Sequence, residues 1–273
     1  VPAVVPPDPR ASIPGLLADR VATAGDETLI EHKATPDGPW QPVTAREFEA
    51  VATAVAKGLV ARGIAPGQSV GIMSRTRYEW TILDFATWLA GAVPVPLYET
   101  SSAEQVHWIL SDADVRLLVV ETAHHAEVVA QVRDQLPGLT DVLVVEDGAI
   151  ATLTADGADV PDEEIARRRT LAGAADLATI IYTSGTTGRP KGVELTHGNF
   201  VELAANAIAK LGAQVCPPGS RTLLFMPLAH VFARFIEVLV VPAGAVLGHT
   251  PDTKNLVADL GTFRPTFILS VPR

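Results

Sequence analysis

The sequence is almost free of cysteine, and this excludes two classes of protein. Cys216 is the one cysteine among 273 residues, so the chain cannot form an internal disulfide or a cysteine-based zinc site. Two prolines follow this residue, and we expect an unreactive thiol in a loop. Dithiol redox proteins and zinc fingers are therefore excluded.

Long apolar runs and an excess of basic residues are missing as well. The longest charge-free runs, 85–98 and 238–251, are shorter than the ~18 residues of a membrane-spanning helix. The amino terminus, VPAVVPPDPR, lacks a signal-peptide pattern, so we expect a cytoplasmic protein. With 31 Asp and Glu against 21 Lys and Arg, the net charge of −10 argues against a nucleic-acid partner and an electrostatic membrane anchor. Loose peripheral membrane contact remains open.

Helix and strand patterns alternate along most of the chain. Thr44 and Glu47 have the spacing of a capping box before apolar residues at helical spacing, and a second such pair begins at Ser102. Apolar runs at 70–73, 117–120 and 142–145 lie between helical patterns, as expected of buried parallel strands. The sequence therefore predicts an α/β fold with parallel sheets flanked by helices.

The alternation is interrupted once, by a segment rich in Ala, Gly and Asp. Acidic residues at 162–164 and arginines at 167–169 fit the two ends of one short helix, with the arginines solvated. The chain ends directly after an apolar strand pattern, so we expect the last unit to be incomplete at its carboxyl end. The expected organisation is an extended arm over 1–15, a first αβ subdomain over 16–145, a linker over 146–175 and a second, truncated αβ subdomain over 176–273.

The segment 182–192, YTSGTTGRPKG, has the composition of a phosphate-binding loop. It follows a buried strand pattern, and its backbone N–H groups and hydroxyls can converge on an anion whose charge the lysine neutralises. The spacing is not that of a Walker A loop, because Pro190 stands where the second glycine would fall. The residues assigned to phosphate binding are Thr183, Ser184, Gly185, Thr186, Thr187, Gly188 and Lys191.

This segment resembles the phosphate loop of the adenylate-forming enzymes, which include acyl-CoA synthetases, adenylation domains and luciferase-like ligases. FMPLAHVFAR at 225–234 and FRPTFILSVPR at 263–273 resemble the long-chain fatty acyl-CoA synthetase branch, and residues 88–120 resemble the region ahead of the loop. The resemblance covers nearly the whole chain but only the amino-terminal portion of the family. The family's later motifs, which include the catalytic lysine, have no match, so no catalytic residue is assigned and the chain alone is expected to be inactive.

The resemblance implies ATP-dependent activation of a long-chain fatty acid to an acyl-adenylate, followed by transfer to coenzyme A. It assigns stabilisation of the departing pyrophosphate to the loop with Mg²⁺, and a contact with the metal, through Mg–ATP, to Thr186. It places His230 beside the acyl substrate, with Val231 and Phe232 lining the acyl channel. The alternatives are a fatty acyl-AMP ligase that feeds a carrier protein, and a piece that binds nucleotide without catalysis.

Several other polar residues are expected to have structural roles or none. Spacing alone favours a role for His230 in satisfying backbone groups at a helix start, and a structural hydrogen bond for His197. Arg189 occupies a variable position of the family's loop, and we expect it to face solvent. His124 and His125 lack carboxylate partners at ligand spacing, which argues against a zinc site.

Overall fold

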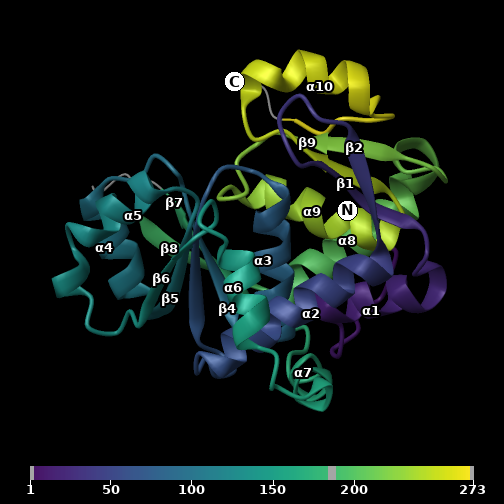
Figure 1. The fold of residues 1–273 in the computed structure, drawn as a ribbon. Helices are drawn as coiled ribbons and strands as arrows, with labels where there is room; N and C mark the ends of the chain where they lie inside the picture. The colour runs from purple at the N-terminus through teal and green to yellow at the C-terminus, as the bar shows by residue number, and fades with distance from the viewer. Residues whose placement is uncertain (1–2, 184–188, 271–273) are drawn as a thin grey trace.

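Two four-stranded sheets and a separate hairpin form the framework of the molecule (Figure 1). The computed structural model describes residues 3–183 and 189–270. The strand order is β2-β1-β10-β9 in the first sheet and β4-β3-β5-β6 in the second, and β7 pairs with β8 in the hairpin. The strands are β1 (Thr28–Lys33), β2 (Trp40–Thr44), β3 (Ser69–Met73), β4 (Val93–Leu97), β5 (Val115–Val120), β6 (Asp141–Val144), β7 (Leu177–Thr183), β8 (Lys191–Thr196), β9 (Arg221–Leu224) and β10 (Val246–His249).

The helices surround these strands, and two of the helix starts follow the sequence prediction directly. Thr44 and Glu47 form a complete capping box at the start of α2, and Ser102 and Gln105 form one at the start of α4. The helices are α1 (Ile13–Ala24), α2 (Ala45–Ala61), α3 (Tyr78–Leu89), α4 (Ala103–Asp112), α5 (Ala123–Ala130), α6 (Ala149–Asp156), α7 (Asp162–Arg168), α8 (His197–Val215), α9 (Val231–Ala243) and α10 (Leu256–Phe263), with short 3-10 turns η1 (Arg133–Gln135) and η2 (Thr253–Asn255).

The second sheet confirms the predicted α/β class. All its neighbouring strands run parallel. Side chains of β5 alternate between two cores: Leu118 and Val120 lie in one cluster with residues of α4 and α5, whereas Leu117 and Val119 lie in the main cluster with residues of α2 and α3. Helices therefore cover both faces of this sheet.

The first sheet joins strands from the two ends of the chain. β1 pairs with β10 in parallel and with β2 in antiparallel orientation, and β9 continues the sheet beyond β10. The expected boundaries at 145 and 176 therefore do not separate the two sheets, because pairing follows tertiary packing rather than chain order. The expected arm is also shorter than 1–15: α1 begins at Ile13, and the Ser12 hydroxyl caps it by accepting the Gly15 N–H.

The segment 146–175 is not a linker with one helix, as the sequence suggested, but carries α6 and α7. Leu153 of α6 and Ile165 of α7 are buried in the main core. α6 lies directly against α2, since a Cβ at Gly58 would overlap the Leu153 carbonyl and a Cβ at Gly157 would lie 2.5 Å from the Gly58 nitrogen. The two glycines allow this close approach of α6 to α2. The Ala- and Gly-rich composition of the segment suggested a linker and gave no sign of this packing.

The hairpin lies beside β4 without extending its sheet. The Val93 N–H donates to Gln68 on the β3 side, so by alternation Pro94 and Pro96 lie on the opposite edge, where they supply no N–H donor. Instead, the Thr179 hydroxyl of β7 donates to the Pro94 carbonyl at 2.7 Å. The Trp88 indole of α3 donates to the Ala178 carbonyl at 2.8 Å, so α3 also holds the hairpin in place.

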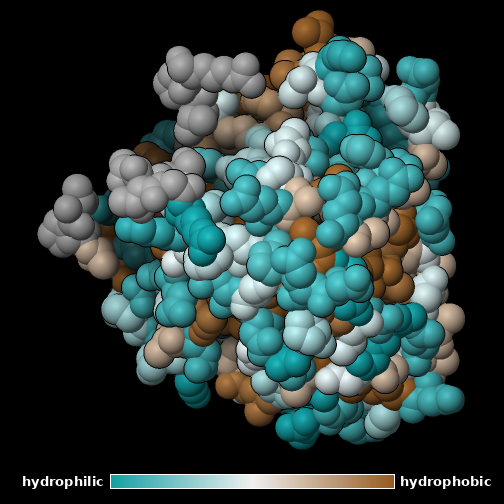
Figure 2. All heavy atoms as spheres, turned by 90° about the vertical axis from the view of Figure 1, so that its left-hand side faces the viewer, coloured by the Kyte–Doolittle hydropathy of each residue, from teal (hydrophilic) through white to brown (hydrophobic). Residues whose placement is uncertain are grey.

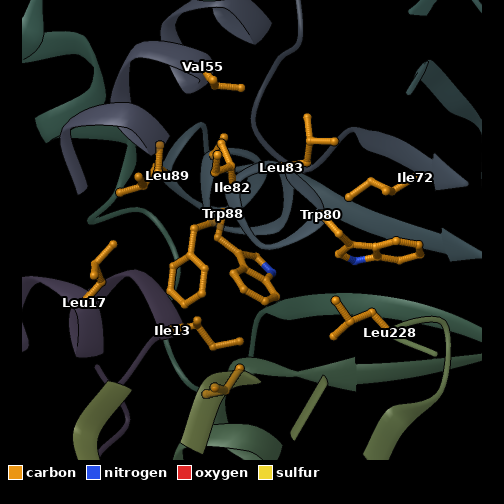
Figure 3. Packing of buried hydrophobic residues seen from close by; sticks show 14 of the residues in the cluster. Ile13, Leu17, Val55, Ile72, Trp80, Ile82, Leu83, Trp88, Leu89 and Leu228 are labelled. Atoms are coloured by element: carbon orange, nitrogen blue, oxygen red, sulfur yellow. The ribbon is translucent and has the colours of Figure 1, made fainter. Parts of the chain in front are cut away.

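Helix α3 lies in the middle of the main core, and every residue from 80 to 89 is buried. Figure 3 shows Trp80, Ile82 and Trp88 of this helix packed among side chains of other elements, including Ile13 of α1 and Leu228. Helix α3 is therefore enclosed on all sides, and its polar side chains, such as Asp84, need partners within the core.

Polar and apolar residues mix on the surface of the molecule. On the face shown in Figure 2, hydrophobic residues are scattered among hydrophilic ones. In the described part of the chain, no helix combines the length and apolar character needed to cross a membrane.

One ion pair is enclosed within this core, between α3 and α9. The Arg234 guanidinium donates to Asp84 Oδ1 at 2.8 Å, and both side chains are fully buried. The Trp80 indole donates to the other carboxylate oxygen at 2.8 Å, and the Arg234 guanidinium lies 5.6 Å from the centre of the Trp88 ring. Both Asp84 oxygens therefore have a hydrogen-bond partner. Burial raises the pKa of Asp84, and the charge and hydrogen bond of Arg234 act against that rise.

Glu237 lies one turn further along α9, beside Asp84, in surroundings that favour its neutral form. Burial, together with the neighbouring Asp84 charge, raises the pKa of Glu237 well above its usual value. Neither of its carboxyl oxygens has a hydrogen-bond partner among the described residues. The two carboxyl groups therefore differ: Asp84 is paired with Arg234, whereas burial and the Asp84 charge favour the protonated form of Glu237.

This assignment predicts that two isosteric substitutions lower the free energy of unfolding by very different amounts. Asp84→Asn leaves the Arg234 charge buried without a counter-ion and should lower the free energy of unfolding by about 3–5 kcal/mol. Glu237→Gln replaces a group whose raised pKa favours the neutral form, and it should change the free energy of unfolding by less than about 1 kcal/mol. Urea unfolding of both variants measures the two values. Equal stability of the two variants would show that the assignment is wrong.

Candidate functional site

The β7–β8 hairpin closes the glycine-rich loop. Its last cross-strand pair joins Thr183 and Lys191, and the pair before it joins Tyr182 and Gly192. Gly192 permits this pairing, because a Cβ at that position would lie 3.2 Å from Cζ of the Tyr182 ring. Thr183 and Lys191 thus face each other where the loop leaves the sheet. The other assigned loop residues lie outside the described residues: Ser184, Gly185, Thr186, Thr187 and Gly188.

Helix α4 holds both strands of the hairpin. The Tyr182 hydroxyl donates to Asp112 Oδ2 at 2.6 Å, and burial together with this carboxylate raises the pKa of Tyr182. On the other strand, the Trp108 indole donates to the Pro190 carbonyl at 2.8 Å. Arg189, which we expected to face solvent alone, is exposed but lies 4.8 Å from the centre of the Trp108 ring. The Trp108 bond to Pro190 holds the chain just before Lys191, and the exposed Arg189 contact adds only about 0.5–1 kcal/mol.

Lys191 is exposed and available for an anionic ligand. Its side chain makes no hydrogen bond or ion pair to any residue in 3–183 or 189–270. The Thr183 residue opposite it is also exposed. An unpaired cation beside a hydroxyl, at the base of a loop rich in backbone donors, matches the chemistry of a phosphate site.

His230 lies at the start of α9 and caps it. Its Nδ1 accepts the Phe232 N–H at 3.2 Å, as an N-cap side chain does. Because Nδ1 is the acceptor, the neutral ring carries its proton on Nε2, which leaves an N–H donor for a ligand. The residue is exposed. The capping role that spacing favoured is therefore present, and it leaves the second ring nitrogen free for another partner.

The apolar residues next to His230 divide into two groups. Val231 is 42% exposed and Phe232 is partly buried, so both can meet a substrate. From Ala233 to Val241, almost every residue of α9 is buried, and these residues belong to the protein core. Among the residues of α9, Val231 and Phe232 in the first turn are therefore the ones left open to a substrate.

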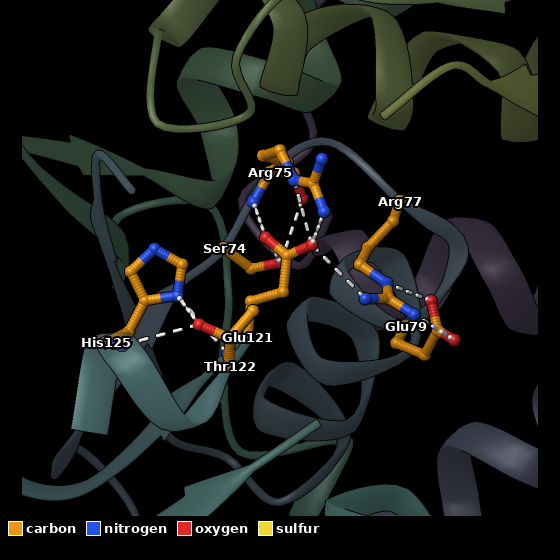
Figure 4. A network of polar contacts seen from close by, with 7 residues as sticks. All are labelled: Ser74, Arg75, Arg77, Glu79, Glu121, Thr122 and His125. Carbon is orange, nitrogen blue, oxygen red and sulfur yellow. Dashed lines mark hydrogen bonds and ion pairs between the residues drawn. The ribbon is translucent and has the colours of Figure 1, made fainter. Parts of the chain in front are cut away.

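A second polar cluster lies at the carboxyl ends of β3 and β5 (Figure 4). Arg75, two residues after β3, donates from Nε and Nη2 to Glu121 Oε1 at 2.9 and 2.6 Å, and its backbone N–H donates to Oε2 at 2.8 Å. Arg77 donates to Glu121 at 3.3 Å and to Glu79 at 2.7 and 3.0 Å. Burial alone would raise the pKa of Glu121, but the Arg75 hydrogen bonds and charge outweigh it and lower that pKa.

Thr76, between these two arginines, links this cluster to the segment that carries His230. Its hydroxyl donates to the Met226 carbonyl at 2.7 Å and accepts the Leu228 N–H at 3.1 Å. The β9–α9 connection is thereby joined to the end of the second sheet.

Two other histidines have structural positions. His197 Nδ1 accepts the Ile13 N–H at 3.2 Å, which confirms the expected structural hydrogen bond, and burial lowers the pKa of His197 to about 4. His125 completes a capping box at the start of α5 by accepting the Thr122 N–H at 3.2 Å. Figure 4 shows this pair next to Glu121.

The predicted site residues thus form two groups. Thr183 and Lys191 lie at the hairpin, while His230, Val231 and Phe232 lie in the first turn of α9. In the part of the chain that the structure describes, no hydrogen bond or ion pair joins the two groups.

Sequence reasoning missed the cluster around Thr76. Charged residues directly after neighbouring parallel strands were a usable signal, because in sheets such as β4-β3-β5-β6 ligands bind where the strand order reverses.

Known proteins that share this structure and sequence identify the fold class and the family of the chain. The fold matches the inhibitor-bound N-terminal domain of FACL13 from Mycobacterium tuberculosis with a TM-score of 0.79 and 26% identity, over 96% of this chain and 63% of that one. A putative long-chain-fatty-acid CoA ligase from Rhodopseudomonas palustris gives a TM-score of 0.78 at 23% identity, over 95% and 63%. The fold is that of the amino-terminal domain of adenylate-forming enzymes. A family model described as AMP-binding enzyme matches residues 17–273, and the chain belongs to this family.

The relatives found by sequence are long-chain-fatty-acid–CoA ligases. FadD15 of Mycobacterium tuberculosis is 43% identical over 251 residues, which cover 91% of this chain and 42% of the relative. Human long-chain-fatty-acid–CoA ligase 1 is 32% identical over 256 residues, which cover 87% and 36%. The chain therefore spans about two fifths of the length of the curated relatives that it matches.

The Glu121 cluster predicts a pH-dependent contribution to stability. Since folding lowers the pKa of Glu121 below 4.5, its contribution is present at neutral pH and is lost as the pH falls through the folded-state pKa. Glu121→Gln should therefore lower the free energy of unfolding by about 2 kcal/mol at neutral pH. The difference from the unsubstituted protein should shrink below pH 4.5. Urea unfolding across this range is the test, and a difference that does not change with pH would contradict the assignment.

Proposed function

We propose that this chain provides the ATP- and fatty-acid-binding part of an enzyme that activates a long-chain fatty acid as its acyl-adenylate and transfers it to coenzyme A. The observation that carries the proposal is the hairpin that presents Lys191 and Thr183 at the base of the glycine-rich loop. The AMP-binding family match and the named relatives support the same reaction class. A cytoplasmic location with loose peripheral membrane contact stays a prediction.

The reaction needs a site that stabilises developing negative charge. A carboxylate oxygen of the fatty acid attacks the α-phosphorus of ATP, the bond to the bridging oxygen breaks, and pyrophosphate leaves with the electron pair. Lys191 and the hydroxyls and backbone N–H groups of the loop sequence are the donors that would stabilise that charge. In the second step a thiolate attacks the acyl carbonyl, and AMP leaves.

Mg²⁺ fits this site as a companion of the triphosphate. No group of three or more metal-binding side chains occurs among the described residues. Mg²⁺ keeps several waters and binds largely through phosphate oxygens in nucleotide sites, so a loop of hydroxyls such as Thr183, together with the proposed Thr186, suits it. When bound, the ion would neutralise phosphate charge.

The acyl substrate would meet the first turn of α9. The Nε2–H of His230 can donate to the fatty acid carboxylate, and Val231 and Phe232 offer apolar surface next to it. With the rest of α9 occupied by core packing, the alkyl chain would leave this turn toward other elements. A fatty acyl-AMP ligase that feeds a carrier protein uses the same first step, and it would differ by not requiring coenzyme A.

Lys191→Ala tests the phosphate site. Loss of the Lys191 charge should weaken Mg–ATP binding about tenfold or more, because a hydrogen bond to a charged group contributes about 1.5–3 kcal/mol. Calorimetric titration of the protein with Mg–ATP measures the change. Arg189→Ala is the matched control: it removes a neighbouring exposed cation that contacts Trp108 and should leave ATP affinity unchanged. An unchanged affinity of Lys191→Ala for Mg–ATP would contradict the assignment of Lys191 to phosphate binding.

His230 can be tested with two variants that separate capping from substrate binding. His230→Ala removes the N-cap and should lower the free energy of unfolding by about 1 kcal/mol, whereas His230→Asn keeps a capping side chain and should preserve stability. Both variants should raise the KM for palmitate, because both lack the Nε2–H donor. If His230→Asn has an unchanged KM for palmitate, then His230 acts only as a cap.

A further inference from the structure

The segment between β9 and α9 has few ways to satisfy its backbone. Pro227 has no N–H, and its carbonyl accepts the His230 N–H at 2.9 Å in a tight turn. Met226 is 9% exposed and Leu228 is fully buried, so their backbone groups cannot rely on water. A buried carbonyl and a buried N–H at these two positions need partners from elsewhere in the fold.

One hydroxyl supplies both partners. Thr76 is 4% exposed, and its Oγ1 donates to the Met226 carbonyl at 2.7 Å while it accepts the Leu228 N–H at 3.1 Å. Only a side chain that is donor and acceptor at one atom can make both bonds. Thr76 thus fixes the backbone on both sides of Pro227, and His230 follows two residues after Leu228.

Thr76 is itself held rigidly from the second sheet. Its neighbour Arg75 makes three hydrogen bonds to Glu121, and its other neighbour Arg77 bonds to Glu121 and Glu79. The Glu121 side chain is fully buried, and its own N–H donates to the Met73 carbonyl at 2.9 Å. Figure 4 shows both arginines converging on this carboxylate. The position of Thr76 is therefore set by the ends of β3 and β5.

We infer that Thr76 is a positioning residue: through its two hydrogen bonds to the 226–228 backbone, it places the first turn of α9, and with it His230, relative to the second sheet. The inference rests on the proposed function for its catalytic consequence, since His230, Val231 and Phe232 are the proposed acyl contacts. Thr76 touches no substrate in this account and acts through the backbone of that segment.

Two substitutions of Thr76 separate this role from general packing. Thr76→Val keeps the shape but removes the hydroxyl, which leaves the Met226 carbonyl and the Leu228 N–H without partners. Thr76→Ser keeps the hydroxyl and should retain both bonds. Thr87→Val is a control for the substitution itself, because Thr87 is buried and its hydroxyl donates to the Leu83 carbonyl of its own helix.

The first measurement does not depend on activity. Amide hydrogen exchange of residues 225–232 should become about tenfold faster in Thr76→Val, since a lost buried hydrogen bond changes the local opening equilibrium by that order. Thr76→Ser and Thr87→Val should exchange in this segment like the unsubstituted protein. Unchanged exchange in Thr76→Val would overturn the inference.

The second measurement tests the catalytic consequence. In steady-state assays of the full-length protein, Thr76→Val should raise the KM for palmitate about tenfold while the KM for ATP stays within twofold, because only the acyl contacts are displaced. Thr76→Ser should restore the palmitate KM. Equal changes in both KM values, or none, would contradict the positioning role. If the unsubstituted protein shows no palmitate-dependent turnover, the proposed function is wrong. The hydrogen-exchange measurement then still tests whether the Thr76 hydroxyl holds the 226–228 backbone in place.

Discussion

The buried ion pair between Asp84 and Arg234 joins α9 to α3, the helix that contacts both halves of the candidate site. It attaches α9, which begins with the proposed acyl contacts, to the enclosed helix α3. Four residues further along α3, the Trp88 indole holds the β7 carbonyl of Ala178 and thereby the hairpin that carries the glycine-rich loop. Moving two charges out of water is costly, so the pair selects one orientation of α9 more than it adds stability.

The site is therefore assembled from elements that are far apart in the chain but share one support. The hairpin is fixed by α3, by α4 and by the Thr179 bond to Pro94 in β4. The first turn of α9 is fixed from inside by Arg234 and from the second sheet by Thr76. This division would suit the proposed two-substrate reaction, in which each element would bind one substrate and hold it at a defined distance from the other.

Local signals in the sequence predicted local structure well. The capping boxes at Thr44 and Ser102, the parallel strands β3 and β5, and the strand-to-loop transition at Thr183 depend on residues within a few positions of one another. The prediction of a linker over 146–175 was wrong, because the close packing at Gly58 and Gly157 depends on two segments about 100 residues apart. Thr76 was missed for the same reason, since its partners lie 150 and 152 residues away.

The central claim is that the chain takes part in adenylation of a fatty acid, and ATP–pyrophosphate exchange measures that half-reaction without the thiol step. With the full-length protein and Mg–ATP, the account predicts exchange that requires palmitate and does not require coenzyme A. Exchange that is absent, or that proceeds equally without a fatty acid, would contradict it.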